Sequence, residues 1–562
     1  MTSRVGFLLL LALVSGPGCR RDASQAPDLI VVDARVWTGD PARQEAEAIA
    51  VRDGRILTVG NSDVVRSMAS PATRVIDAQG RRVVPGFNDA HWHLPLRPQV
   101  DLAGAGRVAE IVRRLGEGQA SLGTEAWLLG RGWGPSDFPG LKPHRQYLDA
   151  VFAGRPVMLT DRDGHQVLVN GVALARAGIT RDTPDPPNGR IGRDPNGEPT
   201  GLLQEAAMAL VQRLVPPVSE DEAYRMVLGE LSKAASYGLT SVQDASASAP
   251  DSVRVKAYKR ALAARTLPIR VRVAVPLEKN VTPERLAELV RLRDSHPDGW
   301  LTFGIAKGML DGTVDGHTAA LLAPYADRPT DTGLPMWDQE TLNASVAAYD
   351  KAGLQVELHA VGDRAIRMAL DAFAHAARVN GTTERRHRVE HVELPSPEDL
   401  PRFRALGVIA STQAMFASPD AVTLGSFAPA LGPERASRAD AFALFDEAGA
   451  VQAFGSDYPV FTMEVMRGIH AAVTRQLPDG TPAGGWYPRN RIGVAAALRH
   501  YTVDAAYASR EEREKGTLSP GRLADFVVLS EDVFSIPPER LWAVKAMVTV
   551  VGGQVRWGGG QK

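Results

Sequence analysis

Residues 85–93 read PGFNDAHWH, a short apolar run that ends in two histidines one residue apart. The chain has only 12 histidines among 562 residues, so a pair at this spacing is unusual. Side chains alternate along a strand, and His91 and His93 therefore lie on one face, as two ligands of one ion would. An exposed strand end with two incidental polar residues is the alternative. Further metal-binding side chains predicted at the same strand end would favour the metal site over the exposed strand end.

The middle of the chain alternates short apolar runs with helical stretches such as PERLAELVRLRD and QETLNASVAAYDKAG. This alternation is typical of βαβ units around a parallel sheet. We predict eight strands, which lie in the segments RVVPGFNDAHWH, GLTSVQDAS, IRVRVAVP, LTFGIAKGMLDG, GLQVELHAVGD, RHRVEHVEL, GVIASTQAM and AVQAFGSDYP. Eight strands alternating with helices predict an α/β fold, a (β/α)8 TIM barrel with its active site at the C-terminal strand ends.

The length of the chain predicts two further parts. A barrel of this kind takes roughly 250 residues, whereas the first and eighth strands enclose about 370. The surplus lies in residues 97–230, which we interpret as a large insertion after strand one, over the barrel mouth. Short strands with Asp-Gly and Gly-Gly turns occur at both chain ends, and they predict a composite β-sandwich of residues 28–84 and 515–560. The barrel then takes residues 85–96 and 231–514.

The first residues are typical of a secretory signal, because MTSR precedes the short apolar run VGFLLLLALVSG. Cys19, the only cysteine, follows at once, and residues 1–19 resemble a bacterial lipoprotein signal in which that cysteine is lipidated. Ordinary secretion with an incidental cysteine is the alternative. We expect an exported protein of the periplasm or cell envelope, tethered by residues 20–27 and touching the membrane only through a lipid anchor.

The composition excludes some classes of partner. The chain carries 64 basic and 65 acidic residues, so no polybasic surface for nucleic acid is indicated. No apolar run after the first 20 residues is long enough to span a bilayer.

Several predicted strands end in residues that bind metals. Lys307 lies on strand four with Asp311 following, His359 ends strand five, His391 ends strand six and Asp457 ends strand eight. Imidazoles and carboxylates are the ligands Zn²⁺ takes when cysteine is absent. Any one of these residues alone could be structural. Together, at the strand ends a barrel uses for catalysis, they predict a metal site.

The chain resembles the amidohydrolase superfamily of metal-dependent hydrolases, and within it the amidohydrolase-3 (YtcJ-like) family. The motifs that carry the resemblance run along nearly the whole chain: PGFNDAHWH, GRGWGPSDF, RPVMLTDRDGHQVLVN, DTPDPPNGRIGRDPNGEPTGLL, AKGMLDGTVDGHTAALL, LHAVGDRAI, RVEHVEL, GSDYPV and GRLADFVVL. The resemblance implies the barrel, the composite sandwich and one or two divalent metals, Zn²⁺ foremost. It implies one metal on His91, His93 and Asp457, a second on His359 and His391, and a bridging carboxylated Lys307.

The function implied is hydrolysis of a carbon–nitrogen bond in a small amide-type substrate, such as an N-acyl or N-formyl amine. A metal-activated hydroxide would attack, with Asp457 as general base and then general acid. A purely structural ligand is the alternative for Asp457. A cyclic amide, a carbamate or an ester would suit the same site. A non-catalytic binding or sensor protein and a metal phosphoesterase are the rival classes, and a homodimer stays open.

Four further residues are weaker candidates for contact with substrate. His165 lies in the predicted insertion, and Asp311 and His317 follow the lysine of strand four. Trp133 would line an apolar pocket. Each has a structural alternative: a loop turn for His165 and Asp311, and core packing for Trp133. Glu390 points the opposite way from His391 on its strand, which favours pairing in the core.

Overall fold

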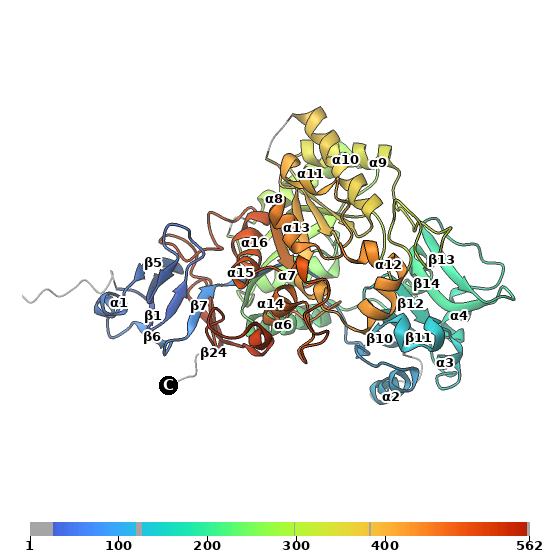
Figure 1. Ribbon diagram of the computed structural model, residues 1–562, viewed down its shortest axis with the longest axis horizontal. Coiled ribbons are helices and arrows are strands. Elements are labelled where there is room, and N and C mark those ends of the chain that lie inside the picture. The colour runs from blue at the N-terminus through green and yellow to red at the C-terminus, as the bar shows by residue number, and fades with distance from the viewer. Residues whose placement is uncertain (1–25, 120–125, 297, 382–383, 559–562) are drawn as a thin grey trace, which may run out of the picture.

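The computed structural model describes residues 26–119, 126–296, 298–381 and 384–558. The predicted signal and Cys19 lie outside the described residues. Figure 1 shows a small β-rich part at one end, a central barrel and a second sheet at the far end. No helix in the described ranges combines the length and apolar character that a membrane crossing needs.

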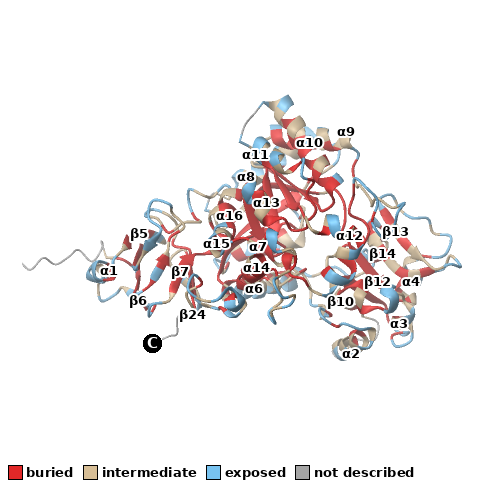
Figure 2. Ribbon diagram, viewed as in Figure 1, coloured by how far each residue is buried: buried red, intermediate tan, exposed pale blue. Residues whose placement is uncertain are grey.

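The central part is the predicted barrel. Eight parallel strands follow one another round the sheet in chain order, starting at β8. They are β8 (Phe87–Trp92), β15 (Leu239–Asp244), β16 (Arg270–Pro276), β17 (Leu301–Met309), β18 (Gln355–Ala360), β19 (Arg388–His391), β20 (Ile409–Gln413) and β21 (Gln452–Gly455). All eight lie in the predicted segments, and Figure 2 shows them buried, as strands covered on both faces must be. The predicted fold class is confirmed.

The barrel closes between its last and first strands. The backbone N–H of Asp457 donates to the carbonyl of His91 at 2.7 Å, and Trp92 forms a parallel bridge with Tyr458. Gly455 makes this approach feasible, because a Cβ there would lie 2.5 Å from the backbone nitrogen of His91. The closure places the end of strand eight directly beside the histidine pair.

Helices return the chain from one strand to the next. They are α6 (Glu220–Ser236), α7 (Val253–Ala263), α8 (Pro283–Asp294), α9 (Gln339–Lys351), α10 (Asp363–Asn380), α11 (Leu400–Leu406), α12 (Ala428–Ala436), α13 (Phe442–Glu447), α14 (Val465–Thr474), α15 (Val494–Tyr501) and α16 (Val503–Ala508). Local sequence sets where they begin. Thr282 accepts a hydrogen bond from the N–H of Arg285 to cap α8, and Asp338 caps α9 in the same way.

Two sheets at one end of the molecule enclose a separate apolar core. One contains β1 (Leu29–Val32), β4 (Ala48–Arg52), β5 (Arg55–Gly60) and β6 (Arg74–Asp77). The other joins β2 (Arg35–Trp37), β3 (Glu45–Ala46) and β7 (Arg82–Pro85) to the C-terminal strands β22 (Phe526–Leu529), β23 (Ala546–Val551) and β24 (Gln554–Gly558). The pairing of β7 with β22, Val83 opposite Val528, unites the two chain ends.

A six-stranded sheet follows β8 in the chain. It contains β9 (Val100–Asp101), β10 (Leu128–Trp133), β11 (Val157–Asp161), β12 (Gln166–Val169), β13 (Gly189–Arg193) and β14 (Pro199–Glu205), with α2 (Val108–Gly118), α3 (Gln146–Asp149) and α4 (Gly171–Ala177) beside it. We call residues 97–230 the insertion. Its loop residues line the same cavity as the barrel strand ends.

Candidate functional site

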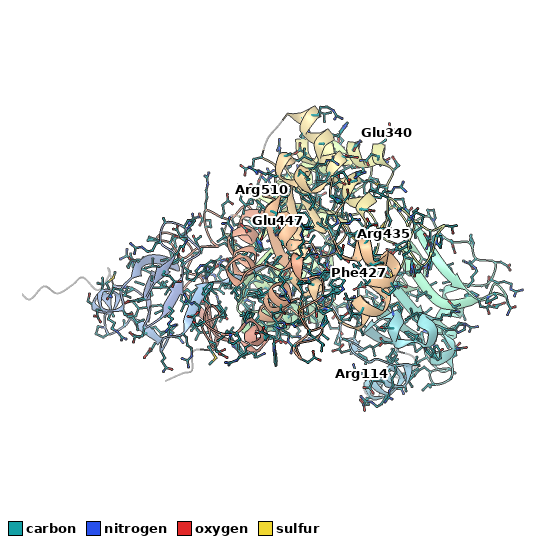
Figure 3. All side chains as sticks on the ribbon, viewed as in Figure 1. Arg114, Glu340, Phe427, Arg435, Glu447 and Arg510 are labelled. Atoms are coloured by element: carbon teal, nitrogen blue, oxygen red, sulfur yellow. The ribbon has the colours of Figure 1, made fainter. Side chains whose placement is uncertain are left out.

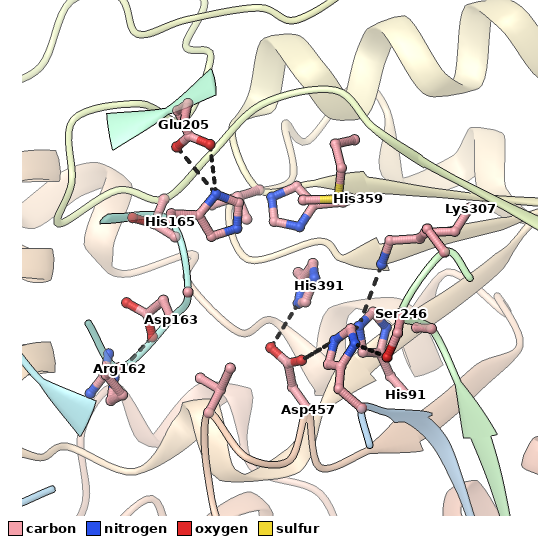
Figure 4. A pocket seen from close by; sticks show the side chains of 18 of the residues that line it. His91, Arg162, Asp163, His165, Glu205, Ser246, Lys307, His359, His391 and Asp457 are labelled. Atoms are coloured by element: carbon pink, nitrogen blue, oxygen red, sulfur yellow. Dashed lines mark hydrogen bonds and ion pairs between the residues drawn. The ribbon is translucent and has the colours of Figure 1, made fainter. Parts of the chain in front are cut away.

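The histidines of PGFNDAHWH lie with Lys307 and Asp457 at one point of the barrel mouth (Figure 4). The Nε2 atoms of His91 and His93 are 3.2 Å apart, and Lys307 Nζ is 3.4 Å from His91 Nε2. Asp457 Oδ1 lies 2.9 Å from His93 Nε2 and 3.5 Å from His91 Nε2. The alternation along the strand thus brings the two rings together as expected.

His359 and His391 complete the group. Their ring centroids are 4.5 Å apart, and the His391 ring lies 4.7 Å from that of His91. Asp457 Oδ2 is 4.0 Å from His391 Nδ1. His391 and Asp457 both adopt left-handed backbone conformations, with φ of 72° and 54°. Such strain is typical of functional positions, where the surrounding structure holds it.

The residues present fit a divalent metal. Asp457 Oδ1 is buried and makes no well-directed hydrogen bond, so it has a free lone pair. Burial lowers the pKa of His91, His359 and His391 well below the usual value, which leaves their rings neutral, the form that binds metals. Within the described ranges, His91, His391 and Asp457 form the one set of three ligands whose atoms all lie within 4.8 Å.

Lys307 is buried beside these rings. It is 4% exposed, and burial lowers the pKa of its amine. An ammonium group at this position would face imidazole nitrogens with little water to solvate it. Burial thus acts toward the neutral amine, while the carboxylates of Glu357, Glu390 and Asp457 act against it.

A second set of contacts fixes the orientation of the rings. Glu390 Oε2 lies 2.5 Å from His91 Nδ1, and Arg388 holds the same carboxylate at 2.8 Å. The expected core pairing of Glu390 is thus present, and its partner is His91. Carboxylates that hold the outer nitrogen of a ligating histidine fix its tautomer and raise its basicity.

His165 and Glu205 reach the same cavity from the insertion. His165 Nδ1 lies 3.0 Å from Glu205 Oε2, and its ring lies 4.9 Å from that of His359. Although burial opposes charge, Glu205 raises the pKa of His165 to about 9. Glu205 can approach the barrel because Gly312 has no side chain, since a Cβ there would lie 2.0 Å from Glu205 Oε1. His165 therefore presents a charged imidazolium to the cavity.

Three of the weaker candidates do not line the cavity. Trp133 is wholly buried in the core of the insertion, where its Nε1 donates to the carbonyl of Leu159. The prediction that it lines the pocket is wrong. Asp311 accepts from the N–H groups of Val361, Gly362 and Ala320, and its Oδ1 lies 3.6 Å from His359 Nε2. Asp311 therefore supports the loop beside His359.

His317, the third of these candidates, also points away from the cavity. Its Nε2 lies 2.9 Å from Asp327 Oδ2, and its ring packs 4.8 Å from that of Tyr325. Its role is in the structure of the loop after strand four.

Several residues that line the cavity of about 1070 Å³ were not predicted from the sequence. Ser246 lies 3.2 Å from His93 Nδ1, and Glu205, Asp315, Glu393 and Asp440 bring further polar groups. Ser246 and Glu393 lie at the C-terminal ends of predicted strand segments, just beyond β15 and β19, so that position was the available signal. Glu205 gave no such signal, because it belongs to the insertion.

Comparison with known proteins agrees with this geometry. The sequence profile described as the amidohydrolase family matches residues 74–556. Protein LONG AFTER FAR-RED 3 of Arabidopsis thaliana is 34% identical over 539 residues, covering 94% of this chain and 91% of that protein. YtcJ of Bacillus subtilis strain 168, which is named as an amidohydrolase, is 32% identical and covers 91% and 95%.

Two further relatives cover almost the same length. The N-substituted formamide deformylase of Arthrobacter pascens is 28% identical, covering 95% of this chain and 99% of that protein. An uncharacterized metal-dependent hydrolase from Pyrococcus horikoshii OT3 has the same fold, with a TM-score of 0.71 at 23% identity over 91% of this chain and 99% of that one. The chain therefore belongs to the amidohydrolase family, in its YtcJ-like branch.

Proposed function

We propose that the protein hydrolyses an amide-type carbon–nitrogen bond in a small molecule, such as an N-acyl or N-formyl amine, with one or two divalent metals, Zn²⁺ foremost. The observation that carries this proposal is the gathering of His91, His391 and Asp457, whose ligand atoms all lie within 4.8 Å of one another and include a buried Asp457 with one oxygen that makes no well-directed hydrogen bond. The relative named N-substituted formamide deformylase supports the amide substrate.

The ligands would be His91, His93 and Asp457 for one ion and His359 and His391 for a second. Lys307 would join them as a carbamate. Its neutral Nζ would form a bond to the carbon of CO₂ and lose one proton, which converts an amine into an anionic oxygen donor. When bound, a divalent ion polarises a carbonyl and lowers the pKa of a water molecule toward neutrality.

The residues of the chain would orient the substrate and move the proton. Asp457 would accept the proton of the attacking water and then donate it to the leaving nitrogen, so that the amine departs neutral. His165, charged through Glu205, would donate a hydrogen bond to the substrate carbonyl oxygen as negative charge develops there. Glu390 would hold His91 in its ligating tautomer.

The metal content of the purified protein tests this proposal. We expect inductively coupled plasma measurement to find one to two equivalents of a divalent metal, and chelation to abolish hydrolysis of a panel of N-acyl and N-formyl amines. Re-addition of zinc should restore activity better in bicarbonate than in CO₂-depleted buffer, because Lys307 would need CO₂. A metal-free preparation that keeps full activity would overturn the proposal.

A further inference from the structure

Acidic residues form a second wall of the cavity, apart from the metal ligands. We call Asp163, Asp315, Glu393 and Asp440 the acidic wall. Asp163 comes from the insertion, Asp315 and Glu393 follow β17 and β19, and Asp440 lies between α12 and α13. Figure 4 shows Asp163 with Arg162 across the cavity from Lys307 and His91. The wall thus faces any substrate that reaches the metal ligands.

Two members of the acidic wall lack a partner. Glu393 is 8% exposed and Asp440 is 5% exposed, and neither carboxyl group has a hydrogen bond or an ion pair within the part of the chain that the structure describes. Two basic groups lie nearby, and neither forms an ion pair with Glu393 or Asp440. Arg162 pairs with Asp163 and Asp420, and Arg475 donates to backbone carbonyls.

Buried carboxyl groups without a partner are costly, so a missing ligand is the physical explanation we pursue. Burial raises the pKa of Asp315 and Asp440 to about 7, as expected for carboxyl groups whose charge is poorly compensated. A positively charged ligand would supply that compensation.

The spacing of the wall favours an organic cation over a metal ion. A metal requires several ligand atoms close together, and among the described residues no set of three from the acidic wall has ligand atoms within 4.8 Å of one another. Spread carboxyl groups instead suit a larger ion with several N–H donors, such as an ammonium or guanidinium group.

Aromatic rings connect the metal ligands to the acidic wall. Phe416 stacks on His391 with centroids 5.9 Å apart, and Phe461 packs 5.1 Å from Phe416. Phe461 in turn carries the guanidinium of Arg162, 4.8 Å above its ring. Phe427, labelled in Figure 3 on the segment facing the insertion, lines the cavity as well. A short apolar linker would lie along these rings.

The chain also limits the length of that linker. His391 and Glu393 are two positions apart, so their Cα atoms are separated by no more than about 7 Å. Because both side chains also line the same cavity, one small substrate can reach the two of them.

We propose that the acidic wall binds a positively charged nitrogen group of the substrate, so that the preferred substrates are N-acyl or N-formyl derivatives of short diamines or similar basic amines. This inference rests on the proposed amide hydrolysis and adds the class of amine. Glu393 and Asp440 would contact the ammonium group, and the rings of Phe416 and Phe461 would contact the linker.

Matched substrates test the proposal. N-formylputrescine and N-pentylformamide have the same length and differ by an ammonium group in place of a methyl group. We expect kcat/KM of the metal-loaded native protein to favour the cationic substrate by about tenfold or more. Glu393→Gln and Asp440→Asn should each remove that preference, measured as the ratio of the two kcat/KM values within the same variant.

The control variant is Glu447→Gln, at an exposed position of α13 (Figure 3), which should keep the native preference. Calorimetric titration with butylammonium chloride separates binding from catalysis. Native protein should bind this ion, and Glu393→Gln should bind it at least about tenfold more weakly.

The outcomes distinguish this proposal from the proposed function. Hydrolysis of both formamides without a cationic preference would overturn the acidic-wall proposal and leave amide hydrolysis standing. Binding of butylammonium that depends on Glu393, without hydrolysis of either formamide, would support the acidic wall and count against formamide hydrolysis. If the protein neither bound butylammonium nor hydrolysed either formamide, both proposals would be overturned.

Discussion

Asp457 is the residue on which the candidate chemistry depends most. It follows the last barrel strand, adopts a left-handed backbone conformation and places one buried oxygen 2.9 Å from His93 Nε2. That oxygen makes no well-directed hydrogen bond. A carboxylate so placed can both ligate an ion and move a proton, and loss of its charge should affect both.

We expect Asp457→Asn to lower kcat by about 10²–10⁴-fold, because the amide cannot accept the proton of the attacking water. Metal content should be measured in the same sample, since a lost ligand would reduce it. Asp371→Asn, which alters an exposed ion pair with Arg402, is the control and should keep native activity. If the Asp457→Asn enzyme were fully active, Asp457 would not transfer a proton and its role would be purely structural.

Glu390 offers a separate test of the proposed metal site, because it contacts His91 and does not line the cavity. We expect Glu390→Gln to weaken metal affinity by about 10–100-fold, since His91 loses the carboxylate that fixes its tautomer. Competition with a chelator measures this affinity. Arg388 loses its charged partner as well, so the melting temperature should be recorded. Unchanged affinity would contradict the orienting role.

The candidate site residues whose positions could be predicted from the sequence are those near strand ends. His91, His93, Lys307, His359, His391 and Asp457 all line the cavity at the barrel mouth, because each lies in or just after a recognisable apolar run, and their binding of a metal stays a prediction. Trp133 was misplaced, since an aromatic residue in an apolar segment gives no sign of whether it faces a cavity or a core.

Among the elements, the strands and helices of the barrel were predictable from local chemistry. The helix predicted over residues 283–294 matches α8, whose cap and first-turn proline are both readable in the sequence. The six-stranded sheet of the insertion was not predicted. Most of its strands pair with a neighbour in the chain, but short apolar runs by themselves do not specify which strands pair.

His500 joins α15 and α16, which follow the last barrel strand, to α13, which precedes it. It ends the buried face of α15 and lies 2.9 Å from Asp504 of α16 and 3.3 Å from Asp446 of α13. Burial opposes its charge, but these two carboxylates raise the pKa of His500 to about 9. The raised pKa means that charged His500 stabilises the folded state fully below about pH 6.5, and that this stabilisation is lost as pH rises through about 9.

Comparison of the native protein with His500→Gln tests this linkage. The difference in melting temperature should be largest near pH 6 and should narrow between about pH 6.5 and 9, as a stabilisation on the order of 3 kcal/mol disappears. Thermal unfolding followed by circular dichroism across this range is the measurement. A difference that stays constant with pH would mean that His500 is neutral in the folded protein.

For the whole molecule, the position of the insertion against the barrel completes the cavity. Arg190 of β13 forms an ion pair with Asp331, in the loop between β17 and α9, at 3.1 Å. Its neighbour Gly189 pairs with Glu205, the residue that holds His165. This contact therefore helps to fix His165 relative to the metal ligands.

We expect Arg190→Ala to lower kcat/KM by about tenfold, since small displacements of positioning groups are costly in catalysis. Arg181→Ala is the matched control, because Arg181 pairs with Glu198 inside the insertion and away from the barrel. It should keep kcat/KM within about twofold of native. Equal effects of the two substitutions would show that the ion pair of Arg190 does not position the cavity.

By itself the sequence determined the barrel, its eight strands and the strand-end residues that gather at its mouth, because hydrophobic periodicity, caps and strand ends are local features of the chain. Only the tertiary structure decided what surrounds them. The pairing of Glu205 with His165, the contact of Glu390 with His91 and the unpartnered carboxyl groups of Glu393 and Asp440 all depend on packing between distant segments. Such contacts form only when the whole chain is folded. The histidines of PGFNDAHWH meet their neighbours from distant segments in that folded state.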